Sequence, residues 1–276
     1  GGAAVSVGGS AFVQGDPLRA DTKLAVSRID GHGGQLDATI GFAPDDNRLD
    51  VDVTGSEPAG GLLAGLLRLP GAPPVAVSVK GAGPLSDWSG KAALSVDGAE
   101  VTTLDVTHRQ TPQGRAVTAK GDGSFANLVP EQARTVLAGR AAFDIAATLL
   151  DAGGFDVERA TLESGAVRAN AHGTIDFAGA SDFVLELAAK DAPVDVTLSP
   201  ENVLTVRSLS ARAFGDGRQP MVDITADVPG VLAGNTRVER LTLTAHSDGF
   251  SVEARRGPLA AEFSAGSVTV ENAAAI

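Results

Sequence analysis

The sequence predicts an all-β protein built on one long, curled antiparallel sheet with two or three short helices. Three observations predict this fold: apolar and polar residues alternate along most of the chain, turn-forming residues separate the alternating runs, and helical patterns are short and few. One side of each run is polar, which is typical of antiparallel sheets with one wet face. New runs begin about every 12 to 14 residues, so roughly eighteen strands fit the 276 residues.

The alternating runs follow one another in chain order. Residues 35–42 carry apolar side chains at every even position, and residues 48–54 carry them at every odd position. Each run is long enough for one strand with a dry and a wet face. The further runs are 75–79, 92–96, 104–106, 143–149, 167–177, 183–187, 194–198, 222–226, 241–243, 250–252 and 259–263.

Turns and helices occupy the segments between these runs. Clusters of Gly, Pro, Asp and Asn favour turns, and they occur for example at residues 43–47 (APDDN) and 214–217 (FGDG). A leucine-rich segment, 58–69, and a segment that opens with Pro130 and Glu131, 130–137, predict two helices. Residues 229–233 could add one helical turn. Three brief helices cannot cover eighteen strands, so most of the apolar strand surface needs another partner.

The chain is predicted to be a single repeat segment, 1–276, of a longer protein, because the alternation runs to both ends and no linker interrupts it. A weak internal repeat supports this organisation. The pattern of residues 41–53 recurs in residues 176–187, about 135 residues later. We therefore expect two repeat units, about 20–125 and 140–255.

The apolar strand faces must be buried in a sandwich, in a closed sheet or inside an open sheet that curls. A sandwich holds seven to nine strands, so eighteen would need two domains and a linker. The curled sheet fits best, and at about 4.8 Å per strand it would form a groove of about 85 Å. Aromatics are only 4% of the chain, so Val, Leu, Ile and Ala would leave room for acyl chains.

The groove is expected to be lined by the apolar positions of the clearest runs, with the intervening acids facing water. The predicted lining residues are Leu36, Ile40, Leu49, Val51, Val77, Leu94, Phe143, Ile145, Ile175, Phe177, Leu185, Leu187 and Ile224. The acids expected to face water are Asp37, Asp50, Asp52, Asp176 and Glu186.

Composition argues against several other functions. A net charge of −12 argues against nucleic acid, whose phosphates need clustered Lys and Arg. The absence of Cys excludes thiol catalysis, disulfides and Cys-ligated zinc. No catalytic motif occurs, so we expect no enzyme activity and no cofactor.

Several isolated residues of types that could catalyse a reaction or bind a metal or ligand are predicted to have structural roles only. His32, His108, His172 and His246 lie far apart in the sequence and are expected at the surface, without a metal. The Asp-rich segments lack the spacing of a calcium loop and are assigned to turns and to the polar strand face. Trp88 is expected in a turn, as an aromatic plug closing the apolar interior rather than a surface on which a ligand stacks.

One stretch resembles a known family. Residues 83–98, GPLSDWSGKAALSVDG, follow a leucine-rich helix and the segment PGAPPVAVSVKG within residues 55–81. Together they resemble the repeat region of the TamB family of translocation and assembly module proteins, which is grouped with AsmA-like proteins and, more distantly, bridge-like lipid-transfer proteins. The specific likeness covers about forty residues, and the general alternation covers the whole chain.

The resemblance implies a periplasmic protein with a taco-like β groove, anchored in the inner membrane through a segment absent from this chain. It implies phospholipid acyl chains as cargo between the two membranes. It also implies outer-membrane protein assembly with the β-barrel protein TamA, reached through other parts of the parent protein. Two alternatives stay open: a chaperone-like scaffold whose edges pair with unfolded outer-membrane strands, and a packed β-repeat stalk or adhesin without lipid.

Overall fold

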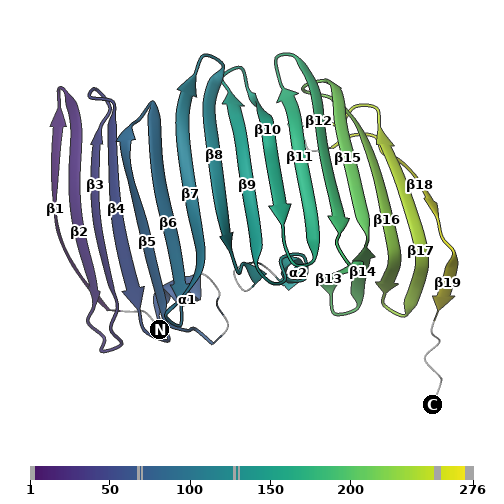
Figure 1. The fold of residues 1–276 in the computed structure, drawn as a ribbon, viewed down its shortest axis with the longest axis horizontal. Coiled ribbons are helices and arrows are strands. Elements are labelled where there is room, and N and C mark those ends of the chain that lie inside the picture. Colours follow the sequence, from purple (N-terminus) through teal and green to yellow (C-terminus); the bar gives the residue numbers. More distant parts are fainter. Residues whose placement is uncertain are drawn as a thin grey trace. The chain divides into compact units, whose positions relative to one another are not determined.

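The computed structural model describes residues 4–66, 69, 71–126, 129, 131–251 and 256–270. Strands make up 71% of the chain and helices 3%, which confirms the all-β prediction. The described residues form nineteen strands, and they pair in antiparallel fashion (Figure 1). The chain divides into two compact units, unit 1 (Gly1–Leu128) and unit 2 (Val129–Ile276).

Unit 1 is an antiparallel meander in which each strand pairs with the next. The turn between its sixth and seventh strands shows how the sequence sets the register. Asp97 and Gly98 have φ angles of 53° and 76°, as a two-residue hairpin turn requires. The strands are β1 (Val5–Gly15), β2 (Leu18–Arg28), β3 (Gln35–Ala43), β4 (Arg48–Glu57), β5 (Val75–Pro84), β6 (Asp87–Val96), β7 (Ala99–Thr111) and β8 (Gly114–Gly123), with helix α1 (Leu62–Leu66) between β4 and β5.

Unit 2 begins as the same kind of meander and then branches. Helix α2 (Glu131–Arg134) precedes β9 (Ala141–Leu150), β10 (Gly154–Glu163), β11 (Val167–Asp176), β12 (Ala180–Ala189), β13 (Val194–Ser199), β14 (Asn202–Val206), β15 (Ser208–Asp216), β16 (Met221–Ala233), β17 (Thr236–Ser247), β18 (Ala260–Ser264) and β19 (Ser267–Val270). Strand β12 pairs directly with β15, so the β13–β14 hairpin stands outside the succession. The long strand β16 pairs with β15 along its first half and with β14 along its second. Strand β17 then pairs with β16, β18 and β19.

The helical segments differ from the prediction. The segment 58–69 contributes only the five residues of α1, and the segment 130–137 only the four residues of α2. Positions 67, 68 and 130 of these predicted helices lie outside the described residues.

The predicted helical turn at 229–233 is wrong, because this segment is the second half of β16. Val231 lies there between Leu204 of β14 and Val238 of β17. Pro229 sits where the partner of β16 changes from β15 to β14, a place where a missing backbone donor is tolerated. Two neighbouring strands therefore outweigh the local tendency of Pro to start a helix.

Candidate functional site

The apolar residues of unit 1 share one side of its sheet, which we call apolar face 1. Residues directly opposite each other on paired strands project to the same side. Ile40 lies opposite Val51, and Val77 lies opposite Leu94. The register places all six lining residues predicted in this unit on apolar face 1: Leu36, Ile40, Leu49, Val51, Val77 and Leu94. The alternate positions Asp37, Asp50 and Asp52 lie on the opposite, polar face 1.

Unit 2 has a corresponding side, which we call apolar face 2. Ile145 lies opposite Ala160 of β10, and Leu185 lies opposite Ala171 of β11 and Ala211 of β15. The strand residues predicted as lining that share this face are Phe143, Ile145, Ile175, Leu185, Leu187 and Ile224. Glu186 and Asp176 occupy alternate positions, on polar face 2.

Phe177 lies just beyond the end of β11 rather than within the strand, so the strand register does not assign it to a face. The side chain of Asp176 accepts a hydrogen bond from the Ala178 amide at 2.9 Å, as in the turns that Asp favours. The Phe177 amide donates to the Gly153 carbonyl at 3.2 Å, and its own carbonyl accepts from Arg218 Nε at 3.0 Å. Phe177 therefore belongs to the turn that connects β11 to β12.

Ile175 also differs from an open lining residue, since its exposed fraction is only 7%. It lies opposite Phe155, whose ring meets Phe183 edge-on at a centroid distance of 5.7 Å. Phe183 in turn lies opposite Gly173, which has no side chain. This part of apolar face 2 is filled by the protein's own side chains.

Much of the remaining apolar surface is uncovered. Ile40 and Phe42 of unit 1 are 39% and 37% exposed, and Ile145 and Leu149 of unit 2 are 38% and 53% exposed. The chain as a whole has an accessible surface of 16326 Å². Two separate compact domains of half its 27.7 kDa mass would expose only about 13,000 Å² together. The excess is expected for strands whose apolar side has no second layer.

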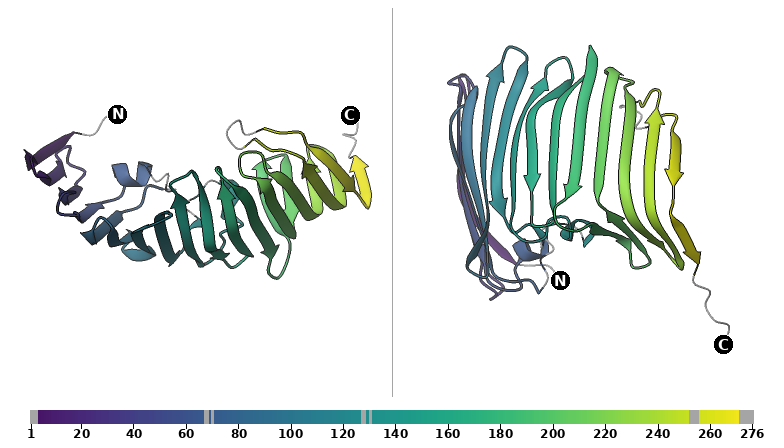
Figure 2. Two further views of the ribbon diagram at one scale, coloured as in Figure 1. Left: turned by 90° about the horizontal axis from the view of Figure 1, so that it is seen from above. Right: turned by 45° about the vertical axis from the view of Figure 1, so that its right-hand side comes forward.

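Helix α1 covers one end of apolar face 1 (Figure 2). Ala64 and Leu69 are buried against Val75 at the start of β5, and Leu94 and Val96 of β6 pack around them. A hollow of about 150 Å³ lies beside this contact, between the sheet and the helix. Its lining is mainly aliphatic and includes Val5, Val26, Leu36, Leu62 and Leu63.

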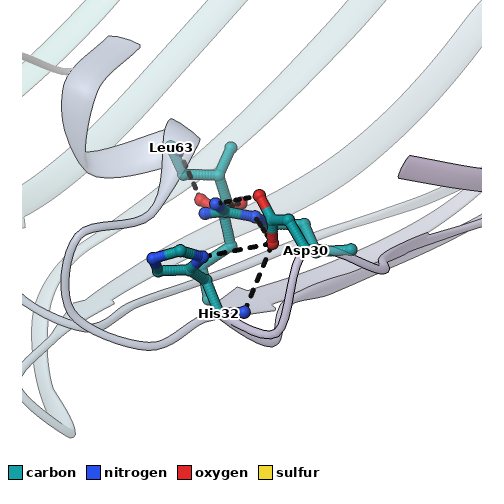
Figure 3. A network of polar contacts seen from close by, with 5 residues as sticks. Asp30, His32 and Leu63 are labelled. Atoms are coloured by element: carbon teal, nitrogen blue, oxygen red, sulfur yellow. Dashed lines mark hydrogen bonds and ion pairs between the residues drawn. The ribbon is translucent and has the colours of Figure 1, made fainter. Parts of the chain in front are cut away.

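A buried ionic network holds the beginning of α1 (Figure 3). Arg28 donates from Nε and Nη2 to the two carboxylate oxygens of Asp30 at 3.1 and 2.7 Å. Glu57 accepts a hydrogen bond from the Leu63 amide at 2.5 Å and lies 3.9 Å from Arg28 Nη1. The hydrogen bonds from Arg28 hold the pKa of Asp30 far below its usual value. The network therefore ties α1 to β2 and β4.

Trp88 also lies on apolar face 1, within β6 rather than in the predicted turn. A Cβ atom added to Gly81 or Gly90 would come within 2.1 or 2.4 Å of its ring, so the indole rests on these two paired glycines. Its Nε1 donates to the Leu49 carbonyl of β4 at 3.1 Å. The ring thus reaches from β6 across β5 to β4. Trp88 covers the apolar side, as an aromatic plug would, but as part of a strand.

The polar faces carry cross-strand ion pairs. On polar face 1, Lys80 Nζ lies 3.3 Å from Asp52 Oδ2, and Lys91 Nζ lies 3.0 Å from Asp105 Oδ1. Shallow hollows of about 560 and 500 Å³ lie over polar faces 1 and 2, lined by such charged residues and by Ser, Thr and Gly. Exposed ion pairs of this kind contribute little stability but keep their side of the sheet hydrated.

The histidines occupy four different surroundings. His32 lies 3.4 Å from Asp30, and His172 projects from polar face 2. His108 is opposite Trp88, on apolar face 1.

His246 lies between two aspartates, a pairing that the sequence analysis missed. Its Nδ1 is 2.5 Å from Asp223 and its Nε2 is 2.7 Å from Asp248. These hydrogen bonds raise the pKa of His246. Asp223 and His246 are register partners on β16 and β17, so only the strand pairing reveals them.

Within the described ranges, no three His, Asp or Glu side chains are arranged to hold a metal ion. None of the helices described there has the length and apolarity needed to cross a bilayer.

No family model, curated protein or solved structure matches the chain. The resemblance to the TamB repeat over residues 55–98 therefore stays a prediction from the sequence.

Proposed function

We propose that apolar faces 1 and 2 bind phospholipid acyl chains, and that the chain is a segment of a conduit for phospholipids between the inner and outer membranes. The observation that carries the proposal is the row of half-exposed aliphatic side chains that crosses successive strands of each unit. Ile40, Val51 and Leu49 belong to this row in unit 1, and Ile145, Leu185 and Leu187 in unit 2.

The energetics favour an apolar ligand. Apolar surface left in water costs about 25 cal/mol for each Å². Exposed apolar patches larger than a few hundred Å² usually mark a binding surface. Acyl chains would remove this surface from water without forming directional bonds. A ligand held in this way can slide along the row, from strand to strand, because no hydrogen bond has to break at each step.

The shape of the side chains supports the same cargo. Ala, Gly and Val occupy many positions between the larger residues, as at Ala171 and Ala211 beside Leu185. Small side chains beside large ones leave room for a flexible hydrocarbon chain. Curling of each sheet around the acyl chains, which would shield them from water, is part of this proposal.

The proposed cellular setting rests on the resemblance to the TamB repeat. In that setting the segment works in the periplasm, held at the inner membrane by a part of the parent protein outside this chain. It then supports outer-membrane protein assembly with TamA. The acyl-chain site does not depend on this setting and can be tested on the chain alone.

The alternative of a packed β-repeat stalk is less well supported. A stalk would bury these side chains, whereas Ile40 and Ile145 keep 39% and 38% of their surface exposed. Below α1, the buried apolar cluster consists of Ala64, Leu69 and Val75 with a few neighbours. The uncovered row is the part of the molecule that needs a ligand.

The test is photo-crosslinking at two adjacent positions of β12. A photoreactive residue at Leu185 should capture phospholipid, because position 185 lies on apolar face 2. The same residue at Glu186, on polar face 2, should capture little. Mass spectrometry of the crosslinked products gives the lipid yield at each position. Equal capture at both positions would contradict the proposal, as would the absence of lipid at Leu185.

A further inference from the structure

A buried polar group faces the hollow between α1 and the sheet, which we call the α1 hollow. Arg28 and Glu57 both line this hollow of about 150 Å³, and the side chain of each is only 8% exposed. Arg28 binds Asp30 through Nε and Nη2. Among the described residues, none accepts a hydrogen bond from Arg28 Nη1. A buried donor of this kind needs an acceptor, because leaving it unpaired is costly.

Glu57 has an oxygen in the same situation. Its Oε2 accepts the hydrogen bond from the Leu63 amide at 2.5 Å, but no residue in the described ranges donates a hydrogen bond to its Oε1. Glu57 Oε1 lies 3.9 Å from Arg28 Nη1, so one oxygen atom about 2.8 Å from each can reach both. That atom has to accept from Arg28 and donate to Glu57, and a hydroxyl group does both.

The charge of the network selects a neutral ligand. Arg28 carries one positive charge, and the carboxylates of Asp30 and Glu57 carry two negative charges. A phosphate or carboxylate would bring a further negative charge to a guanidinium that is already balanced, so the two carboxylates would repel it. The free N–H groups of Arg28 therefore suit a neutral acceptor.

The other walls of the α1 hollow favour hydrocarbon. Val26 of β2, Leu36 of β3, and Leu62 and Leu63 of α1 line it. Gln35 lines it too, but its alternate position on β3 directs its side chain to polar face 1. The volume is several times the share of one water molecule, about 30 Å³, and further waters would lack polar partners there. Apolar cavities of about 150 Å³ accommodate a molecule the size of benzene.

The α1 hollow belongs to the interior of unit 1. All but one of its lining residues lie between positions 26 and 63, on β2, β3, β4, α1 and the turn before β3. Val5 is the single contribution of β1. The polar network and the leucines that define the hollow therefore do not depend on what pairs with the outer edge of β1.

We propose that the α1 hollow binds the hydroxyl end of a neutral lipid, such as a long-chain alcohol or an acylglycerol. The hydroxyl accepts from Arg28 Nη1 and donates to Glu57 Oε1, and the adjoining methylene groups pack on Leu36, Leu62 and Leu63. Leu36 also belongs to apolar face 1, so a longer hydrocarbon chain can continue along that face. The inference does not rest on the proposed phospholipid transport, because recognition takes place at the polar network and not on the open row.

Titration with 1-hexanol tests the proposal on the natural chain. NMR should show saturable binding, with nuclear Overhauser effects between the alcohol and the methyl groups of Val26 and Leu63. Hexanoate has the same carbon chain with a negative charge and should bind about tenfold more weakly. 1-Methoxypentane has as many non-hydrogen atoms as 1-hexanol but accepts a hydrogen bond without donating one, so its affinity should also fall about tenfold.

A matched pair of substitutions on β2 locates the site. Val26→Phe places a ring in the α1 hollow without touching the polar network and should abolish saturable binding of 1-hexanol. Leu24→Phe lies on the same strand and the same face but outside the hollow, so it should leave the affinity unchanged. Circular dichroism and the melting temperature show whether both variants fold. If Val26→Phe does not fold, the ligand series on the natural chain decides the question.

Water as the only occupant would overturn the proposal. The Arg28 side-chain protons would then show Overhauser effects to water, and 1-hexanol would show none to Val26 or Leu63. Equal affinities for 1-hexanol and hexanoate would overturn it as well, since the network would then not select a neutral hydroxyl. Phospholipid capture at Leu185 reports on apolar face 2 of unit 2, so failure of the proposed function is distinguishable from failure of this site.

Discussion

In each unit, a long connection interrupts the meander after the fourth strand, and the two connections form different structures. Residues 58–74 leave β4 and return as β5, which pairs directly with β4. Residues 190–207 leave β12 and return as β15, which pairs directly with β12. The first connection contains α1 and packs on apolar face 1, whereas the second contains the β13–β14 hairpin and pairs with β16. The pairing of the main strands is therefore insensitive to what is inserted between them.

The local sequence decides which of the two structures forms. Residues 62–67 are LLAGLL, which presents leucines at helical spacing. Residues 194–206 alternate Val and Leu with polar residues on either side of Pro200 and Glu201, which is a hairpin pattern. Two insertions of similar length thus cover an apolar face in one unit and extend the sheet in the other.

The largest expected effect is a difference in folding stability between two Arg substitutions. One is at a filled position of apolar face 2, and the other is at an open position of apolar face 1. Ile175→Arg should unfold unit 2, because its 7% exposure leaves the guanidinium without water or a partner, at a cost of several kcal/mol. Ile40→Arg should leave unit 1 folded, because the 39% exposed position allows the side chain to reach water. Urea denaturation followed by circular dichroism measures both variants. Equal destabilisation by the two would mean that both faces are packed alike.

The second effect concerns the cover that unit 1 builds for itself with Trp88. Gly81→Ala places a methyl group within 2.1 Å of the indole, so the ring must move and its bond to Leu49 should break, at a cost of about 1–3 kcal/mol. The single Trp also reports the change directly, through a red-shifted fluorescence spectrum.

The matched control for Gly81→Ala is the same change in a Trp88→Ala background, where the methyl group meets no ring. The cost should fall there to what the contact with the Ser89 carbonyl, 2.9 Å from the same methyl group, causes by itself. A cost that persists in full would assign the effect to the contact with the Ser89 carbonyl of β6 instead of the indole.

A smaller effect is expected on the rate of proteolysis, which compares how firmly each of the two inserted connections is held. Glu57→Ala removes the acceptor for the Leu63 amide and one carboxylate beside Arg28, so the α1 connection should open more often. Proteolysis within residues 58–74 should become roughly tenfold faster. Thr135→Ala removes an exposed hydrogen bond to the Asp195 carbonyl of β13 and should change cleavage of the hairpin far less. Similar acceleration at both sites would show that the two connections are held equally.

The smallest effect is a pH dependence confined to unit 2. Asp223 and Asp248 raise the pKa of His246 above its ordinary value of 6.5. The stabilisation is therefore complete below about pH 6.5 and is lost as pH rises through the raised pKa. His246→Gln should lower the melting temperature at pH 5.5 and have little effect at pH 9. Trp88 fluorescence, which follows unit 1, should not register the substitution at either pH.

Local alternation was sufficient to predict most of the strands and the side on which their residues lie. The period of two is a property of the extended backbone, so Leu36, Ile40 and Leu49 share a face whatever the partner strand is. The turn at Asp97 and Gly98 and the leucines of α1 are equally local signals. For this reason the all-β fold and the composition of apolar faces 1 and 2 could be predicted from the residues alone.

Only the tertiary structure decided features that depend on contacts between distant segments. Alternation does not say that β15 rather than β13 pairs with β12, nor which side chains meet His246, Trp88 and Ile175 across the neighbouring strands. Ile175 is buried because Phe155 and Phe183 come from the strands on either side, and Trp88 is accommodated because two glycines face each other across β5 and β6. Burial depends on which side chains meet across strands, and that is a nonlocal property of the chain.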